Sequence, residues 1–186
     1  FDSYGQQVTE RLVTDLARGQ VTIVSGLALG IDALAHSAAL EAGGRTIAVL
    51  ACGLDVVYPA RNRELARRIC ESGQGALLSE YPLGVRPESG NFPARNRVIS
   101  GISQGVLVIE AGEKSGALIT AEFANKQGRE VFAVPGGIFS SRSCGANKLI
   151  RDGAHLVLEV KDILDALNLF MLPQQMEVQQ ALPENA

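Results

Sequence analysis

Two short segments of the chain carry an aromatic residue, a proline and the triplet Arg-Asn-Arg in the same order. The first reads Tyr58-Pro-Ala-Arg61-Asn62-Arg63, and the second reads Phe92-Pro-Ala-Arg95-Asn96-Arg97. An aromatic ring can stack on a base while guanidinium groups hold phosphates, and proteins that bind single-stranded nucleic acid combine these two contacts. We therefore predict a site for an anionic chain, most simply single-stranded DNA, that includes Tyr58, Asn62, Arg63, Phe92, Arg95, Asn96 and Arg97.

The second segment stands where a helix is expected to begin, over residues 93–103. Cations near a helix N-terminus oppose the helix dipole, so their presence there favours another purpose, such as a phosphate contact. Two alternatives stay open. The arginines could simply solvate helix surfaces, or Arg95 and Arg97 could form internal ion pairs with Glu80 or Glu110.

A third candidate contact is the turn Lys114-Ser115-Gly116, which follows an apolar strand and precedes a helix. Such a turn gathers backbone N–H groups that can hold a phosphate. The spacing GxxxxGK[ST] is absent, so ATP hydrolysis is not expected. We predict that Lys114, Ser115 and Gly116 belong to the site, with the Gly116 amide as a neutral donor.

The segment from Ser25 to Asp32 also joins a strand to a helix. It lacks the pattern GxGxxG, so it does not predict dinucleotide binding. We predict Ser25 and Gly26 as site residues, with the Gly26 amide donating to an anion at the helix N-terminus. The alternative is close strand–helix packing with Asp32 as a first-turn cap. His36, one turn later, could pair with Asp32 or be a hydrogen-bonded structural histidine.

The sequence gives little support for catalysis. Ser25, Ser79 and Ser115 have no neighbouring base, and no GxSxG motif is present. The nearest acid–base set is Glu80, Glu110 and Glu122, for which pairing with arginines is the favoured interpretation.

Metal binding is not expected either. Cys52, Cys70 and Cys144 are far apart, and the two histidines, His36 and His155, lack the spacing of metal ligands. An odd number of scattered cysteines indicates reduced thiols in a cytoplasmic protein.

The charge is unevenly distributed along the 186 residues, although the net charge is only −3. Seven arginines and four glutamates lie between Arg61 and Arg97, whereas six acids and one lysine follow from Asp152 onward. The middle of the chain is therefore basic and its end acidic, so the electrostatic potential is set locally and not by the net charge. No apolar run reaches the roughly 20 residues that a membrane span needs. The chain starts without methionine or a signal peptide, so it could be a piece of a longer protein.

Short apolar strands alternate with amphipathic helices throughout the chain. This alternation predicts an α/β fold with a mainly parallel sheet and helices on both faces, over one domain of residues 1–168, followed by a polar tail at 169–186. Right-handed crossovers place every strand C-terminus at one edge. We expect that edge to carry Ser25-Gly26, Cys52-Gly53, Ser79-Glu80, Glu110-Ala111 and Pro135-Gly136.

Seven segments, in order, resemble the DNA-processing protein A family, also called Smf. They are SGLALGIDALAH (25–36), GLDVVYP (53–59), LLSEYPLG (77–84), FPARNRVISGIS (92–103), EAGEKSGALITAEFA (110–124), GREVFAVPGGIF (128–139) and GANKLIRDGA (145–154). The resemblance implies an extended Rossmann-like domain without enzymatic activity or cofactor. It implies a homodimer that binds single-stranded DNA, protects incoming DNA and helps to load the RecA recombinase during natural transformation. Its implied basic pocket matches Ser25-Gly26, Asn62-Arg63, Arg95–Arg97 and Lys114–Gly116.

The resemblance also implies a strand before residue 1 that ends in a Gly-Ser/Thr-Arg turn, whose arginine contacts DNA. That turn is not in this sequence. The family's small flanking domains are missing or shortened as well.

Two alternatives to a DNA-binding module follow from other residues. Pro135-Gly136-Gly137 and Glu122 are similar to part of the site in Rossmann-like nucleoside-monophosphate phosphoribohydrolases. A scaffold that acts through protein contacts is the other alternative. It would use the apolar strip Val157, Leu158, Ile163, Leu164, Leu167 and Phe170, which could equally be core.

Overall fold

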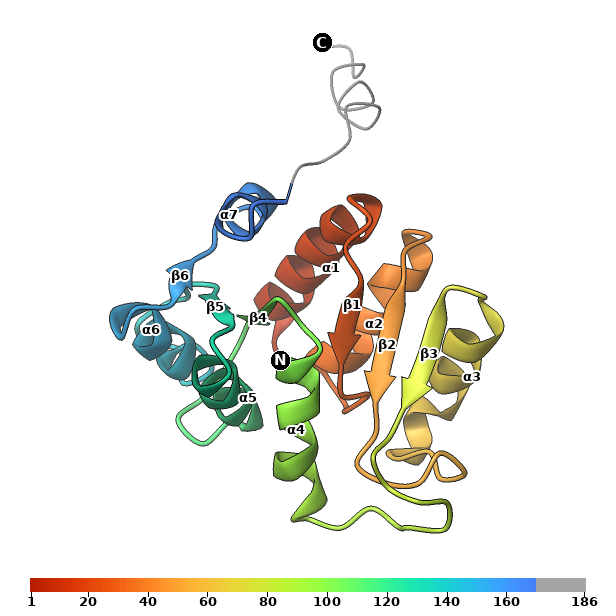
Figure 1. Ribbon diagram of the computed structural model, residues 1–186. Coiled ribbons are helices and arrows are strands. Elements are labelled where there is room, and N and C mark those ends of the chain that lie inside the picture. The colour runs from red at the N-terminus through yellow and green to blue at the C-terminus, as the bar shows by residue number, and fades with distance from the viewer. Residues whose placement is uncertain (170–186) are drawn as a thin grey trace, which may run out of the picture.

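The computed structural model describes residues 1–169, which fold into alternating helices and strands (Figure 1). The helices are α1 (Ser3–Arg18), α2 (Ile31–Glu41), the 3-10 turn η1 (Ala60–Asn62), α3 (Arg63–Glu71), α4 (Asn91–Gly101), α5 (Gly116–Lys126), α6 (Cys144–Arg151) and α7 (Val160–Ala166). The strands are β1 (Ile23–Ser25), β2 (Thr46–Val49), β3 (Gly75–Leu78), β4 (Gly105–Val108), β5 (Glu130–Ala133) and β6 (His155–Leu156). The predicted polar tail lies, apart from Leu169, outside the described residues.

The strands form two parallel three-stranded sheets, ordered β1-β2-β3 and β4-β5-β6. Ile23 is opposite Thr46 in the first sheet, and Gly105 is opposite Glu130 in the second. The predicted α/β class with parallel strands is therefore confirmed, but the expected single sheet is divided in two. The division falls where the chain crosses from β3 through α4 to β4.

Helices cover both faces of the first sheet, with α2 and α3 behind it and α4 in front in the view of Figure 1. Asp2 precedes the long helix α1, and its carboxylate caps the helix by accepting from Gly5 N at 3.1 Å. One side of α1 packs on α2 through Val13 and Ala17. Another side packs on the second sheet, so α1 links the two sheets.

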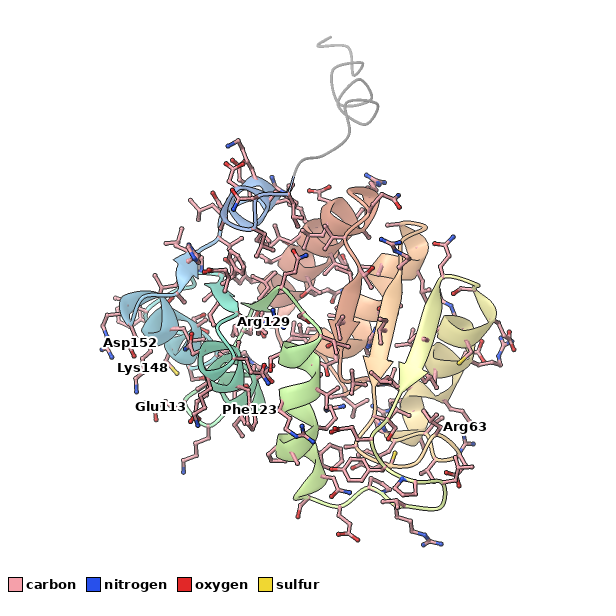
Figure 2. The ribbon with its side chains drawn as sticks, viewed as in Figure 1. Arg63, Glu113, Phe123, Arg129, Lys148 and Asp152 are labelled. Carbon is pink, nitrogen blue, oxygen red and sulfur yellow. The ribbon has the colours of Figure 1, made fainter. Side chains whose placement is uncertain are left out.

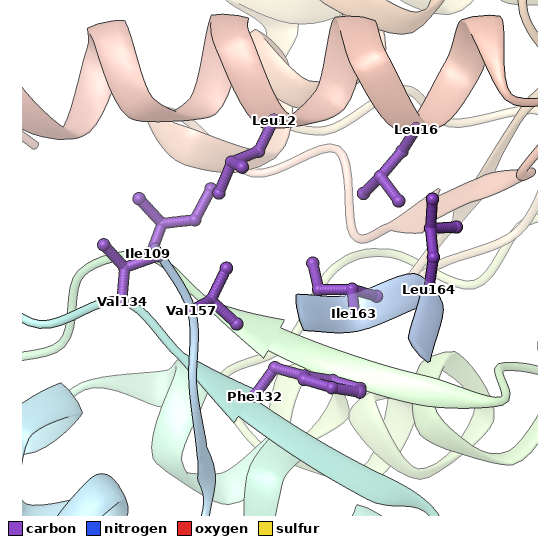
Figure 3. Close-up of a cluster of buried hydrophobic side chains, with 8 residues drawn as sticks. All are labelled: Leu12, Leu16, Ile109, Phe132, Val134, Val157, Ile163 and Leu164. Carbon is purple, nitrogen blue, oxygen red and sulfur yellow. The ribbon is translucent and has the colours of Figure 1, made fainter. Parts of the chain in front are cut away.

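Figure 3 shows this link: Leu12 and Leu16 of α1 face Phe132, Val157 and Ile163. Burial of such side chains contributes roughly 1.5–3 kcal/mol each. Most of the apolar strip proposed for protein contacts is thus part of the core, with Val157, Ile163 and Leu164 buried. Leu158 is exposed, and Phe170 lies outside the described residues.

His36 is fully buried between α2 and β2. Its Nδ1 lies 2.7 Å from Thr46 Oγ1, and that hydroxyl donates to Ile23 O at 2.9 Å. The hydroxyl proton is used, so Nδ1 is the donor to Thr46 and the neutral ring joins α2 to the first two strands. Among the described residues, His36 Nε2 has no hydrogen-bond partner. His36 is therefore the hydrogen-bonded structural histidine of the two alternatives, and the pairing with Asp32 is not made.

We expect His36 to make the fold sensitive to acid. Burial lowers the pKa of His36 from 6.5 to about 4; nearby Asp32 opposes this shift and Arg95 adds to it. The unfolded chain therefore takes up this proton first. The neutral His36 ring makes its full contribution to stability above pH 6.5. As the pH falls toward 4, this contribution is lost and the free energy of unfolding decreases by about 3 kcal/mol.

Urea unfolding at a series of pH values measures this loss. His36→Gln cannot titrate, so its free energy of unfolding should fall less steeply between pH 7 and pH 4, even though the variant is less stable at neutral pH. The same steepness in both proteins would show that His36 does not cause the acid sensitivity.

Candidate nucleic-acid interface

A cleft of about 1110 Å³ lies between the facing edges of β1 and β4. Its depth is lined by apolar side chains, including Ile23, Leu107 and Phe132. Polar side chains that follow the strand ends line its mouth: Ser25, Asp32, Arg95, Glu110, Ser115 and Arg142. Open α/β folds bind ligands at this place, beyond the carboxyl ends of the strands where the strand order reverses.

Arg95 is a buried member of this mouth, only 5% exposed. Its Nη1 donates to Gly26 O at 2.8 Å and also to Val49 O, and its Nε donates to Asn96 Oδ1 at 3.2 Å. Burial lowers the pKa of Arg95, while the charge of Asp32 raises it. The guanidinium thus joins the carboxyl ends of β1 and β2, and it does not face solvent as a DNA contact should. Neither predicted ion pair, with Glu80 or Glu110, involves Arg95.

Gly26 is the residue against which Arg95 packs. A Cβ at this position would lie 2.5 Å from Arg95 Nη2 and 2.7 Å from Cζ. No side chain larger than hydrogen fits there unless the guanidinium moves. Gly26 is therefore required for close packing, as the alternative interpretation of this segment held.

Two further side chains fix the loop after β1. The Asp32 carboxylate accepts from Gly26 N at 3.0 Å and from Ala28 N at 3.2 Å. Asn62 Nδ2 donates to Leu27 O at 2.8 Å and to Ala28 O at 3.2 Å. The Gly26 amide, which we expected to donate to an external anion, is therefore occupied by Asp32. Asn62 is buried and acts on the protein's own backbone.

Asn96 performs a similar task at the turn after β4. It is buried, and its Nδ2 donates to Gly116 O at 3.3 Å, which connects α4 to the start of α5. Ser115 caps α5 by accepting from Ala117 N at 3.3 Å. These contacts fix the turn and leave the Lys114 side chain exposed, with no ion pair to any described residue.

The two Arg-Asn-Arg segments meet through their aromatic residues. The ring centroids of Tyr58 and Phe92 are 5.5 Å apart, with the planes tilted by 52°. Tyr58 is about half exposed, and Arg63 at the start of α3 is also exposed. Arg97 is exposed but donates to both carboxylate oxygens of Glu80, at 2.8 and 2.9 Å. For Arg97, the ion-pair alternative is therefore the one observed.

The predicted residues thus divide into two groups. Tyr58, Arg63, Arg97, Lys114 and Gly116 are exposed, and Ser25, Phe92 and Ser115 are partly exposed; Gly26, Asn62, Arg95 and Asn96 are buried and hold the loops in place. Figure 2 shows Arg63 at one side of the molecule and Glu113, the neighbour of Lys114, at the other. Arg63 and Lys114 are thus far apart and Arg95 is buried, so the expectation that Arg63, Arg95, Arg97 and Lys114 line one basic pocket is corrected.

Sequence reasoning missed Arg142, which is exposed and lines the cleft mouth. The position of Arg142 in the sequence could have indicated it, because this residue lies in the connection that follows the carboxyl end of β5, on the same edge. The sequence-based interpretation of Asp32 was a first-turn helix cap, whereas the structure shows that this carboxylate orders the loop after β1.

Two carboxylates considered for acid–base chemistry have partners among the described residues. Glu122 lies on the exposed side of α5 and pairs with Lys126 at 2.6 Å. Glu110 follows β4, and its side chain, which is 7% exposed, lies against the start of α1 and accepts from Asp2 N at 3.4 Å.

Within residues 1–169, no group of three acidic, histidine or cysteine side chains could hold a metal ion. The three cysteines are free, and burial raises the pKa of Cys52. None of the helices in this range is long and apolar enough to cross a membrane.

Residues 1–168 match the sequence profile of the family described as DNA recombination-mediator protein A. Protein Smf of Synechocystis is 48% identical over 97% of this chain and 45% of its own length. DNA processing protein A (DprA) of Streptococcus pneumoniae is similar in structure, with a TM-score of 0.83 and 46% identity over 89% of this chain and 57% of that one.

DNA processing protein A of Helicobacter pylori has a TM-score of 0.80 and 33% identity, over 90% of this chain and 75% of that one. The chain spans about half the length of the Smf and DprA relatives it matches, from 45% to 56% for the first four.

Proposed function

This chain belongs to the DNA recombination-mediator protein A family, and on that premise we propose that it binds single-stranded DNA along the carboxyl edge of its two sheets. The observation that carries the proposal is the half-exposed Tyr58 ring against Phe92, with Arg63 exposed nearby in sequence. A π-face next to a cation suits an unpaired base followed by a phosphate. The Helicobacter pylori relative has a described single-stranded DNA binding mode, which supports the same ligand.

In this proposal the two groups of residues have different tasks. Arg63 and Lys114 hold phosphates directly. Arg97 can join them by exchanging Glu80 for a phosphate, since an exposed ion pair contributes at most about 1 kcal/mol. The buried residues Asn62, Arg95 and Asn96 act indirectly, because they set the positions of the loops that carry these contacts.

We extend the proposal for this protein with the functions that the family resemblance implies. It is a cytoplasmic protein that protects incoming DNA and helps to load RecA during natural transformation and recombination. The resemblance also implies a homodimer, in which two copies of the edge would let a single strand engage both and so raise the avidity. We propose no catalytic step, because the family resemblance implies none.

We also propose that residues 1–168 form one DNA-binding domain whose cleft between β1 and β4 receives one further strand. The support is geometric: within residues 1–169, β1 pairs only with β2 and β4 pairs only with β5, and the depth of the cleft between them is apolar. Hydrogen exchange tests this proposal. Amides on the free edges of β1 and β4 should exchange fast in this chain and slowly in a longer form that supplies the strand.

The DNA proposal predicts tighter binding to oligo-dT of about 20 nucleotides than to a duplex of equal length, because stacking needs an unpaired base. Fluorescence anisotropy across about 0.05–0.3 M salt measures both affinities. For single strands, the logarithm of the binding constant should fall by about 0.7 per decade of salt for each phosphate contact. Equal affinity for the duplex, or binding that salt does not weaken, would contradict the proposed function.

A further inference from the structure

Ile138 and Phe139 project from the loop between β5 and α6 and are 84% and 98% exposed. Neither side chain contributes to any buried cluster of the described residues. A single exposed apolar residue is ordinary, but two large adjacent ones at a sheet edge that carries a ligand site indicate a contact surface.

The loop is held in a defined position. At its start, Asn147 Nδ2 donates to Gly136 O at 2.9 Å, and Gly136 N donates to Asn147 Oδ1 at 3.1 Å. Near its end, Ala111 N donates to Arg142 O at 2.8 Å. Between these anchors, Ser140 N donates to Gly137 O at 2.9 Å. Phe139 is therefore presented on a fixed turn, and little conformational entropy is lost when a ligand stacks on it.

The same contacts place the loop beside the turn that carries Lys114. Besides the bond from Ala111 N to Arg142 O, a Cβ on Gly112 would lie 3.2 Å from Ser141 O. Lys114 and Arg142 are both exposed, and neither has an ion pair with a described residue. One acid, Glu113, lies in the same turn. Lys114 and Arg142 thus supply two exposed cations beside the loop. They are opposed by Glu113 and by Asp2, whose pKa is lowered by its hydrogen bond from Gly5 N and further by Arg142.

We propose that Phe139, with Ile138 beside it, is a base-stacking position for single-stranded DNA, with Lys114 and Arg142 holding the adjoining phosphates. The proposal rests on the proposed function and adds a second contact region to it. This region is at the edge of the second sheet, whereas Tyr58 and Phe92 come after strands of the first sheet. DNA fits this surface better than a protein does. A stable protein interface buries about 800 Å² per partner, and two projecting side chains offer far less surface than that.

The chain has no tryptophan, so Phe139→Trp introduces a single fluorescent reporter at this position. Stacking of a base on the new indole should quench its emission when oligo-dT is added. Leu158→Trp is the matched control, because Leu158 is 69% exposed and lies between β6 and α7, away from the β5–α6 loop in sequence. The first variant should be quenched and the second should not. Equal emission changes in both, or no change in Phe139→Trp while anisotropy shows binding, would overturn the proposal.

Phe139→Ala tests the size of the contact. Because this side chain is almost fully exposed, the variant should unfold at the same urea concentration as the parent protein. Its affinity for oligo-dT should fall about 5- to 100-fold, the range for loss of one base–aromatic stack. The salt dependence should stay the same, because no phosphate contact is removed. Unchanged affinity in Phe139→Ala would refute the stacking position, whereas failure of the parent protein to bind DNA would refute the proposed function itself.

Discussion

Arg95→Ala is expected to lower the free energy of unfolding by about 3–5 kcal/mol, the largest effect that we predict for a single substitution. The reason is that the guanidinium satisfies two buried carbonyl oxygens, Gly26 O and Val49 O, at the ends of neighbouring strands. Each acceptor left without a partner costs about 1–3 kcal/mol, and the space left beside Gly26 adds to this cost. The charge on Asp32 would also lose its cationic neighbour.

Arg97→Ala is the matched control, because it removes the same side chain two residues away. Arg97 is 54% exposed and pairs with a Glu80 that is 44% exposed, so its loss should cost less than about 1 kcal/mol. Urea unfolding of both variants makes the comparison. Similar small losses would mean that Arg95 does not hold the strand ends, and Arg95 would then return as a candidate DNA contact.

The second large effect is expected from reversing charge at both ends of the edge. Arg63→Glu combined with Lys114→Glu should weaken oligo-dT binding by about 30- to 100-fold. A unit charge near a phosphate in water is worth about 1 kcal/mol before screening, and each substitution changes the charge by two units. Both side chains are exposed and unpaired within residues 1–169, so the fold should stay intact.

Anisotropy at one fixed salt concentration gives the affinity, and urea unfolding checks the fold. The matched control is Arg67→Glu, since Arg67 is an exposed arginine of α3 whose charge is engaged by Glu64 and Glu71. That variant changes the net charge by two units, half the change made by the double variant, without touching the edge. A loss of binding free energy at least half as large as that of the double variant would show that only net charge matters.

The two Arg-Asn-Arg segments show how far the sequence could predict the site. Their positions at one edge, and the closeness of Tyr58 to Phe92, follow from strand order and loop placement. The direction in which each arginine side chain points cannot be predicted in this way. Arg63 is the first residue of α3 and is exposed, whereas Arg95 stands in the second turn of α4, which begins at Asn91 and not at the expected residue 93. That helix register, together with the packing of α4 on the strand ends, turns Arg95 inward.

The fold class was predictable because short apolar strands alternate with amphipathic helices throughout the chain. The division into two sheets was not predictable from the sequence. No local pattern in β1 or β4 says which strand lies beside it, because pairing depends on segments distant in sequence. Phe139 illustrates the same limit, since an apolar residue after a strand is expected to be buried and only the closed loop shows it to be exposed.

The central claim is that exposed cations along this edge hold the phosphates of a single strand while the buried arginine does not. The most direct measurement is the slope of the binding constant against salt concentration, on logarithmic axes, for oligo-dT. Arg63→Ala combined with Lys114→Ala should make the slope shallower by about 1.4, which is 0.7 for each lost contact. Arg95→Lys should leave the slope unchanged even if its affinity is lower. An unchanged slope in the double variant, or a shallower slope in Arg95→Lys, would contradict the account.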